Sequence, residues 1–292
     1  MSETEISVLS SRLCELGEGA SYDPASDSLL WFDILNGLML QHPLDGSETI
    51  VHRIGQMASA VAGIDPTRQL IFTETGFYVR NRLTGGLDLL AALEADKTAT
   101  RSNDARVHPS GALWGGTMGK KAEDGAGAIY WFRKGEIRKL FDRISIPNSI
   151  AFSADGTVGY YVDTAVGDLM RVACDPATGL PTGEPKLFAR LDGPGGFDGS
   201  VVDNDGTLWN ARWGEARLVA YAPDGALIRE IAMPASQVTC PAFMGVKADR
   251  LAITSAYAEL DAAARAKDPH AGATFRLDLP VKGRHEPNVV IA

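Results

Sequence analysis

The sequence has few of the features that mark secreted, membrane or nucleic-acid-binding proteins. It contains only three cysteines, and Cys14, Cys174 and Cys240 are too widely spaced for a CxxC metal motif or an even set of disulfides. We therefore expect reduced thiols and a cytoplasmic protein. The 28 Lys and Arg residues are outnumbered by 37 Asp and Glu, and the net charge of −9 argues against binding to nucleic acid or to an anionic membrane.

Long apolar runs are also missing. No stretch approaches the length of a membrane span, and residues 1–13 lack the basic and apolar regions of a signal peptide. Apolar residues make up 45% of the chain and charged residues 22%, which is typical of a protein with a large buried core. No linker divides residues 1–292, so we predict a single domain that is a monomer or a small homo-oligomer.

Helical patterning is scarce. The one candidate helix covers residues 256–270, "AYAELDAAARAKDPH", which are rich in Ala and in acidic and basic residues. Elsewhere short runs of Val, Ile, Leu and aromatic residues alternate with turns containing Gly, Asp, Asn and Pro. This pattern predicts an all-β protein.

A unit made of a turn and an apolar strand recurs along the chain. Its strands start near Leu29, Leu70, Leu113, Val158, Leu208 and Leu251, at spacings of 41, 43, 45, 50 and 43 residues. Repeats of roughly 40 to 50 residues with four strands each are typical of β-propellers. Second hairpins follow within repeats, as in "AIYWFRKGEIRKLF". The sequence therefore predicts a six-bladed β-propeller.

A propeller must close its ring, because an open sheet edge invites aggregation. We predict that the N-terminal strand "ISVLSS", residues 6–11, completes the last blade beside the C-terminal "PNVVI", residues 287–291.

Polar residues share one position in the repeat. Four of the six repeats place Glu, Asn or Asp ten or eleven residues before the turn strand: Glu18, Asn103, Asn148 and Asp198. The other two repeats have Ser59 and Cys240–Pro241 there. Any one such residue would be read as a turn residue. Because the innermost strand of each blade lines the central channel, residues at a fixed phase converge at one end of it.

The converging set consists of oxygen donors. Glu18, Asn148 and Asp198, with Asn103 adjacent, offer carboxylate and amide oxygens that suit Ca²⁺, Mg²⁺ or Mn²⁺ and can also accept Zn²⁺ or Fe²⁺. We predict one divalent metal ion at this position, of undetermined identity.

Several stretches, taken in order, resemble the senescence-marker-protein, regucalcin and gluconolactonase family of six-bladed propeller lactonases. They are "LGEGASYD", "RSNDARVHPSGALWGGTM", "GAIYWF", "PNSIAFSADG", "FDGSVVDNDGTLWNARWG", "VTCPAFMG" and "AGATFRLDLPVKG". The resemblance implies that Glu18, Asn148 and Asp198 bind the metal. It also implies that Arg101 and Asn103 contact the substrate. Asp104 belongs to the same motif, and we place it with the substrate-binding residues.

Two departures from the family pattern affect how far the resemblance carries. Ala20 stands where the N-terminal motif usually has Pro, and its position beyond the ligand suggests little effect. After "GGTM" many relatives have an acidic residue, whereas this chain has Gly119, Lys120 and Lys121. Because we expect this segment to cover the site, the sugar preference of a relative does not transfer.

The predicted activity is metal-dependent hydrolysis of sugar lactones to sugar acids. A divalent metal can polarise the lactone carbonyl or activate water, and Asp198 is the candidate general base because a ligating carboxylate has a second oxygen. One alternative is a calcium-binding regulatory propeller without catalysis. Another is a metal-dependent hydrolase of a different ester, such as a phosphotriester, with a mainly apolar pocket.

Overall fold

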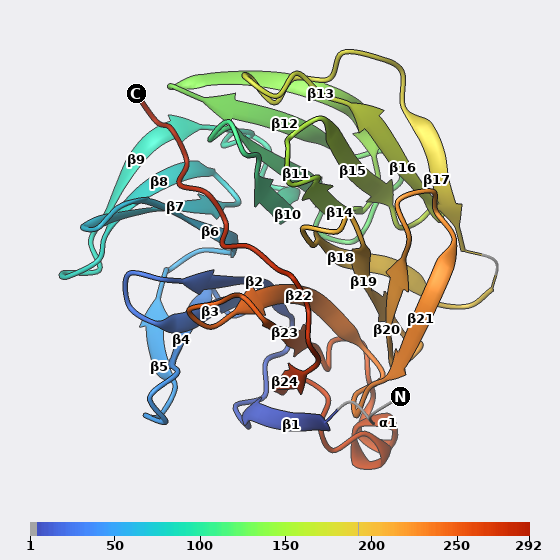
Figure 1. The fold of residues 1–292 in the computed structure, drawn as a ribbon. Coiled ribbons are helices and arrows are strands. Elements are labelled where there is room, and N and C mark those ends of the chain that lie inside the picture. Colours follow the sequence, from blue (N-terminus) through green and yellow to red (C-terminus); the bar gives the residue numbers. More distant parts are fainter. Residues whose placement is uncertain (1–4, 192) are drawn as a thin grey trace.

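The computed structural model describes residues 5–191 and 193–292 of the chain. Its strands form six four-stranded antiparallel sheets arranged as blades around a central axis (Figure 1). This confirms the predicted six-bladed β-propeller. In blades 1 to 5 the four strands follow one another in the chain from the axis outward, and in blade 6 the outermost strand is instead the N-terminal one. In all six blades the predicted turn strand is the second from the axis.

The strands of each blade are given from the axis outward. Blade 1 contains β2 (Gly17–Asp23), β3 (Ser28–Asp33), β4 (Leu38–Pro43) and β5 (Ile50–Arg53). Blade 2 contains β6 (Ala58–Asp65), β7 (Arg68–Thr73), β8 (Gly76–Asn81) and β9 (Leu87–Ala92). Blade 3 contains β10 (Thr100–Val107), β11 (Leu113–Gly119), β12 (Gly127–Arg133) and β13 (Glu136–Ile144).

Blade 4 contains β14 (Pro147–Phe152), β15 (Val158–Asp163), β16 (Asp168–Ala173) and β17 (Lys186–Arg190). Blade 5 contains β18 (Gly196–Val202), β19 (Leu208–Trp213), β20 (Arg217–Tyr221) and β21 (Leu227–Ala232). Blade 6 contains β22 (Val238–Met244), β23 (Arg250–Ser255), β24 (Thr274–Asp278) and β1 (Glu5–Ser10).

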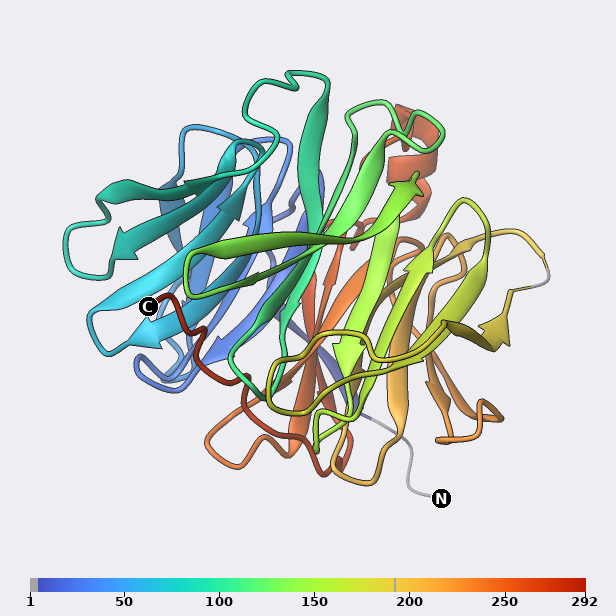
Figure 2. The same cartoon turned by 90° about the horizontal axis from the view of Figure 1, so that it is seen from above.

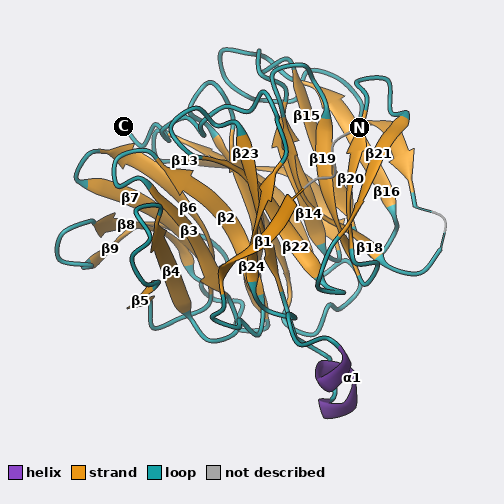
Figure 3. Ribbon diagram, turned by 60° about the horizontal axis from the view of Figure 1, so that its bottom comes forward, coloured by secondary structure: helices purple, strands orange, loops and turns teal. Residues whose placement is uncertain are grey.

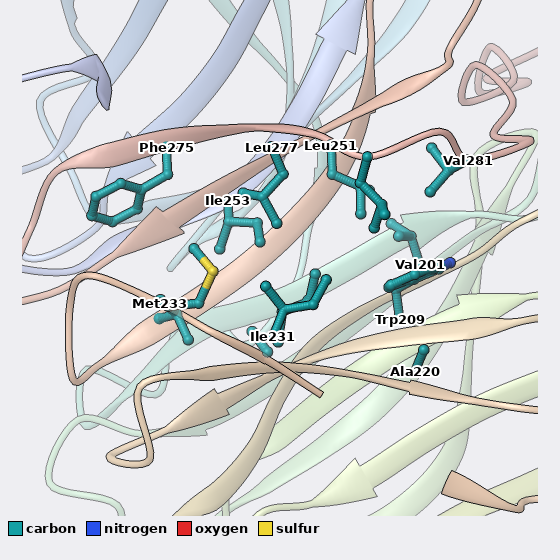
Figure 4. Close-up of a cluster of buried hydrophobic side chains, with 14 of the residues drawn as sticks. Val201, Trp209, Ala220, Ile231, Met233, Leu251, Ile253, Phe275, Leu277 and Val281 are labelled. Carbon is teal, nitrogen blue, oxygen red and sulfur yellow. The ribbon is translucent and has the colours of Figure 1, made fainter. Parts of the chain in front are cut away.

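The hydrophobic core lies between neighbouring blades. Inner strands such as β14 are buried along their whole length, whereas the outer strand β13 consists of exposed and half-buried residues up to the buried Ile144 at its end. The cluster between blades 5 and 6 is built from both sheets, with Trp209 and Ile231 facing Ile253 and Phe275 (Figure 4). Each blade therefore buries both faces against its neighbours, which fixes the inner strands that carry the site.

The N-terminal strand closes the ring as predicted. β1 pairs antiparallel with β24, from Glu5 opposite Asp278 to Ser10 opposite Thr274. Our prediction that this strand lies beside residues 287–291 is wrong. These residues form no strand in blade 6, because the chain leaves β24 and crosses the face of the propeller that is in front in Figure 1.

This C-terminal tail, residues 279–292, contacts every blade. Backbone hydrogen bonds join it to Asp249, Asn204, Gly63, Gly111 and Lys134 in blades 6, 5, 2 and 3. Arg284 donates to the carbonyl oxygens of Val202 at 2.6 Å and Phe152 at 2.5 Å, in blades 5 and 4. His285 packs on Tyr22 of blade 1. The tail thus ties the six blades together at one end of the channel.

The predicted helix is much shorter than expected. Only α1 (Ala262–Lys267) is helical, with the Asp261 side chain accepting a hydrogen bond from the Ala264 N–H at 2.8 Å (Figure 3). The preceding residues are recruited elsewhere, because the N–H groups of Tyr257 and Ala258 both donate to Glu15 O. α1 lies on the opposite face from the C-terminal tail (Figure 2). Within residues 5–191 and 193–292, we find no helix with the length and apolar character needed to span a membrane.

Candidate active site

The inner strands are irregular at one shared level, and the site residues lie there. In each blade the pairing between the first and second strands shifts at this level: after Glu18 in β2, Ala58 in β6, Ser102 in β10, Asn148 in β14, Phe197 in β18 and Val238 in β22. Such bulges redirect side chains and are common beside active sites. Here they turn the polar residues of the repeat toward the channel.

The backbone at this level is tightly constrained. Gly19, next to Glu18, has a φ of 61°, and a Cβ there would lie 1.9 Å from Ser59 O. Only glycine fits this position. Ser149, next to Asn148, also has a positive φ, of 54°, and its hydroxyl donates to Asp198 O at 2.5 Å. The strained residue therefore connects the strands that carry Asn148 and Asp198.

A cavity of about 420 Å³ opens above these residues, on the face opposite the C-terminal tail. Five of the six predicted site residues line it: Glu18, Arg101, Asn103, Asn148 and Asp198. The spatial convergence that the shared phase predicted is therefore present, and the chemical roles of these residues stay predictions. The size is within the range of small-molecule sites.

Asp104 does not line the cavity. Its buried carboxylate accepts a hydrogen bond from Ile150 N at 2.7 Å. Burial raises the pKa of Asp104, and the positive charge of Arg106 opposes that rise. The predicted contact of Asp104 with substrate stays a prediction.

Two carboxylates face each other at the cavity floor. Asp198 is only 3% exposed, and its Oδ1 has no hydrogen-bond partner among the described residues. Burial raises the pKa of both Glu18 and Asp198, and each is raised further by a nearby carboxylate, Asp104 for Glu18 and Glu18 for Asp198. The pair is therefore costly to keep ionised unless a positive charge lies beside it.

Arg101 and Asn103 stand next to this pair and bond each other. Arg101 Nη1 donates to Asn103 Oδ1 at 2.7 Å, and Asn103 Nδ2 donates to Asn148 Oδ1 and to Pro147 O, both at 2.9 Å. Burial lowers the pKa of Arg101 to about 10, and Glu18 and Asp198 oppose this shift, so the guanidinium stays charged at neutral pH. Arg101 Nε is buried and has no hydrogen-bond partner among the described residues.

The charged groups around the cavity include both signs. The cations are Arg101, Lys120 and Lys121, and the acids are Glu15, Glu18, Asp198 and Glu259. Leu16, Leu35, Met118, Ile146 and Trp213 contribute apolar surface. Lys120 and Lys121, in the segment that we expected to cover the site, form part of this wall, and Lys120 is held there by an ion pair with Glu74 at 2.5 Å.

Sequence analysis missed residues that position the site from the second strands. Asp33, at the end of β3, accepts hydrogen bonds from the N–H groups of Glu15 and Leu16, both at 3.2 Å. Asp163, at the end of β15, accepts in the same way from Ser145 and Ile146 at 2.7 and 3.0 Å. These carboxylates hold the chain just before Glu18 and Asn148. The signal was present, since "LLWFD" and "GYYVD" end in Asp at similar phases.

The donor set suits a hard divalent cation. No group of three His, Cys, Asp or Glu side chains is placed to hold a metal within the described residues, so a metal here needs an amide oxygen as a third ligand. Asn148 Oδ1 offers one, because Asn103 uses only one of its two lone pairs. The unpartnered Asp198 Oδ1, Glu18 and this amide oxygen fit such an ion.

The chain is similar to known proteins over most of its length. Residues 16–257 match the family model described as the SMP-30/Gluconolactonase/LRE-like region, and the chain belongs to this family. A Rhizobium meliloti protein named "Putative sugar lactone lactonase" is 49% identical over 96% of this chain and 95% of its own. The L-arabinolactonase of Azospirillum brasilense is 34% identical over 89% of this chain and 87% of its own.

A solved structure is similar along the whole chain. The crystal structure of a calcium-binding protein, regucalcin, from Agrobacterium tumefaciens has a TM-score of 0.96 and 49% identity. The match covers 100% of this chain and 97% of that chain. The family assignment that the motifs implied is therefore confirmed.

Proposed function

We propose that this protein hydrolyses sugar lactones to sugar acids and depends on one divalent metal ion bound by Glu18, Asn148 and Asp198. The family membership, with lactonases among the relatives, makes it a lactone-hydrolysing enzyme. The metal dependence and the sugar substrate are our proposal. The observation that carries it is the pair of buried, facing carboxylates at the floor of the cavity, one of which has an unpartnered oxygen.

A divalent ion bound there would polarise the lactone carbonyl and make nearby water more acidic. Asp198 supplies the base, because one of its oxygens can take a proton from the attacking water while the other stays a ligand. As the water oxygen bonds to the carbonyl carbon, the bond from that carbon to the ring oxygen breaks. The proton held by Asp198 then passes to the leaving ring oxygen, which becomes a hydroxyl group of the product.

The other residues bind and orient the lactone. Arg101 lines the cavity and its guanidinium donates to the lactone, whereas both amide hydrogens of Asn103 are already used, so Asn103 offers a lone pair of Oδ1 to a substrate hydroxyl. Trp213 and Met118 cover part of the ring and limit access of water. A cavity with this many charged groups favours a polyhydroxylated lactone over an apolar phosphotriester.

The test measures acid release from a panel of aldonolactones in weak buffer with a pH indicator. Protein as purified, protein dialysed against a chelator, and dialysed protein with Ca²⁺, Mn²⁺, Mg²⁺ or Zn²⁺ restored are compared with a no-enzyme blank, because lactones also hydrolyse spontaneously. We expect close to one metal ion per chain by elemental analysis, loss of activity on chelation and recovery with metal.

The Asp198→Ala variant should fold and lose turnover, since the core consists of the apolar strands. Turnover that survives chelation would reject the metal dependence and leave the lactonase assignment intact. Metal binding without turnover of any aldonolactone would favour the calcium-binding alternative, which the similarity to a calcium-binding protein motivates.

A further inference from the structure

A continuous series of hydrogen bonds crosses the floor of the cavity and includes one residue that the proposed mechanism does not use. Arg101 donates to Asn103, and Asn103 donates to Asn148, as given above. Asn148 Nδ2 then donates to Thr164 Oγ1 at 2.9 Å, and Thr164 Oγ1 donates to Phe197 O at 2.7 Å. Thr164 follows β15, and it also lines the cavity.

Each bond in this series can run in only one direction. A guanidinium only donates, so Arg101 must meet the carbonyl oxygen of Asn103, which turns the NH₂ group of Asn103 toward Asn148. At the other end Phe197 O only accepts, so the single proton of the Thr164 hydroxyl is committed to it. The hydroxyl can then only accept from Asn148.

These directions fix the orientation of the Asn148 side-chain amide. Its NH₂ group must face Thr164, and its Oδ1 must face Asn103 and the cavity floor, where Glu18 and Asp198 lie. With the opposite rotation the NH₂ groups of Asn148 and Asn103 would meet, and the Asn148 NH₂ group, which only donates, would replace Oδ1 toward any bound cation. The amide is the one proposed ligand that has a wrong orientation, because a carboxylate presents oxygen on both sides.

Thr164 also joins the strands that carry two of the proposed ligands. Asn148 lies on β14, and Phe197 immediately precedes Asp198 on β18, the inner strand of the next blade. β14 and β18 are neighbours around the axis (Figure 1). One hydroxyl thus contacts the side chain of one ligand and the backbone beside another.

We propose that Thr164 is a positioning residue for the metal: its hydroxyl, committed as a donor to Phe197 O, orients the Asn148 amide so that Oδ1 faces the cation. This inference rests on the proposed function, because it assumes that Asn148 is a metal ligand. It adds a residue whose hydroxyl acts through Asn148 rather than on the substrate. Loss of partners that orient a metal ligand typically weakens metal affinity about 10- to 100-fold.

The experiment titrates chelator-treated protein with Mn²⁺ in a calorimeter and records the melting temperature without metal. Thr164→Val removes the hydroxyl with little change in shape, and Thr164→Ser keeps it. Thr73→Val is the matched control, because the buried Thr73 hydroxyl also donates to a backbone carbonyl, that of Gly76 at 3.0 Å, and does not line the cavity. We expect Mn²⁺ affinity to fall about 10- to 100-fold in Thr164→Val and to stay within about threefold of wild type in Thr164→Ser and Thr73→Val.

A second background separates orientation from general support. In Asn148→Asp the ligand is a carboxylate that needs no orienting, so adding Thr164→Val should weaken Mn²⁺ binding much less than it does in the wild-type background. An equal loss in both backgrounds, or wild-type affinity in Thr164→Val, overturns the role of Thr164 while the metal site stands. If the wild-type protein itself binds no Mn²⁺, Ca²⁺ or Zn²⁺, the proposed metal dependence fails and the role of Thr164 fails with it.

Discussion

Replacing Asp198 by Asn should stabilise the metal-free protein while it removes metal binding. Two buried carboxylates face each other at the cavity floor. Burial raises the pKa of both, the charge of Glu18 raises that of Asp198 further, and Asp104 raises that of Glu18. The Asn side chain keeps the shape of Asp and can donate a hydrogen bond to Glu18. The substitution therefore removes one of two like charges from a buried site without leaving a cavity.

The size of the expected gain in the free energy of unfolding follows from the repulsion between the two charges. Two unit charges about 4 Å apart interact by about 4 kcal/mol at an effective dielectric constant of about 20, which sets an upper limit. The pair lowers this cost by taking up a proton, so we expect a gain of about 2–3 kcal/mol in the free energy of unfolding at pH 8. For a chain of 292 residues that corresponds to a melting temperature roughly 3–5 °C higher.

The sign depends on pH. Both carboxyl groups hold a proton more tightly in the folded than in the unfolded chain, where their pKa values are near 3.8 and 4.5. The fold therefore loses stability as the pH rises above these values. The advantage of Asp198→Asn should be small at pH 4 and should grow toward pH 8.

Thermal melting of chelator-treated protein at several pH values measures this difference. The control is Asp65→Asn, in an exposed turn where hydrogen bonds from Arg68 and Thr67 lower the pKa of Asp65, so that variant should gain no stability. Saturating Mn²⁺ should raise the melting temperature of the wild type and leave Asp198→Asn unchanged. The reasoning is refuted if metal-free Asp198→Asn melts at or below the wild-type temperature at pH 8, or if it binds Mn²⁺ with wild-type affinity.

Three further outcomes are expected. Arg101→Ala should retain its metal but lose roughly 10- to 100-fold in kcat/KM on hydroxylated lactones, and much less on a lactone without hydroxyls. Equal losses on both substrates would mean that Arg101 has a structural role. Deleting residues 1–12 should lower the melting temperature, because it removes β1 and exposes the edge of β24. An unchanged melting temperature would contradict closure of the ring by β1. Val289→Ala in the C-terminal tail should cost about 1–3 kcal/mol of stability with kcat unchanged, because Val289 is buried on the face opposite the cavity. A fall in kcat without loss of stability would contradict the expectation that the tail supports the fold and not the active site.

The fold was predictable because its information is local and repeated. Apolar turn strands near Leu113 and Leu208 recur at a spacing that only a ring of similar sheets explains, and both are second strands of blades. The C-terminal tail was misplaced for the opposite reason. "PNVVI" has the composition of a strand, but its backbone hydrogen bonds go to Gly63, Gly111 and Lys134, positions that no local pattern connects to it.

In the candidate site too, the residues that recur in the repeat could be predicted from the sequence, and those that do not recur could not. Glu18, Asn148 and Asp198 were found because each repeats a position within its own blade, and the bulge at that level turns each toward the axis. Thr164 repeats nothing. It matters because its only proton is committed to a carbonyl of the next blade, a fact about the donors and acceptors that surround it after folding. Repetition in a propeller can therefore reveal which residues reach the channel, whereas the orientation of an amide there depends on contacts between blades that have no counterpart in the repeat.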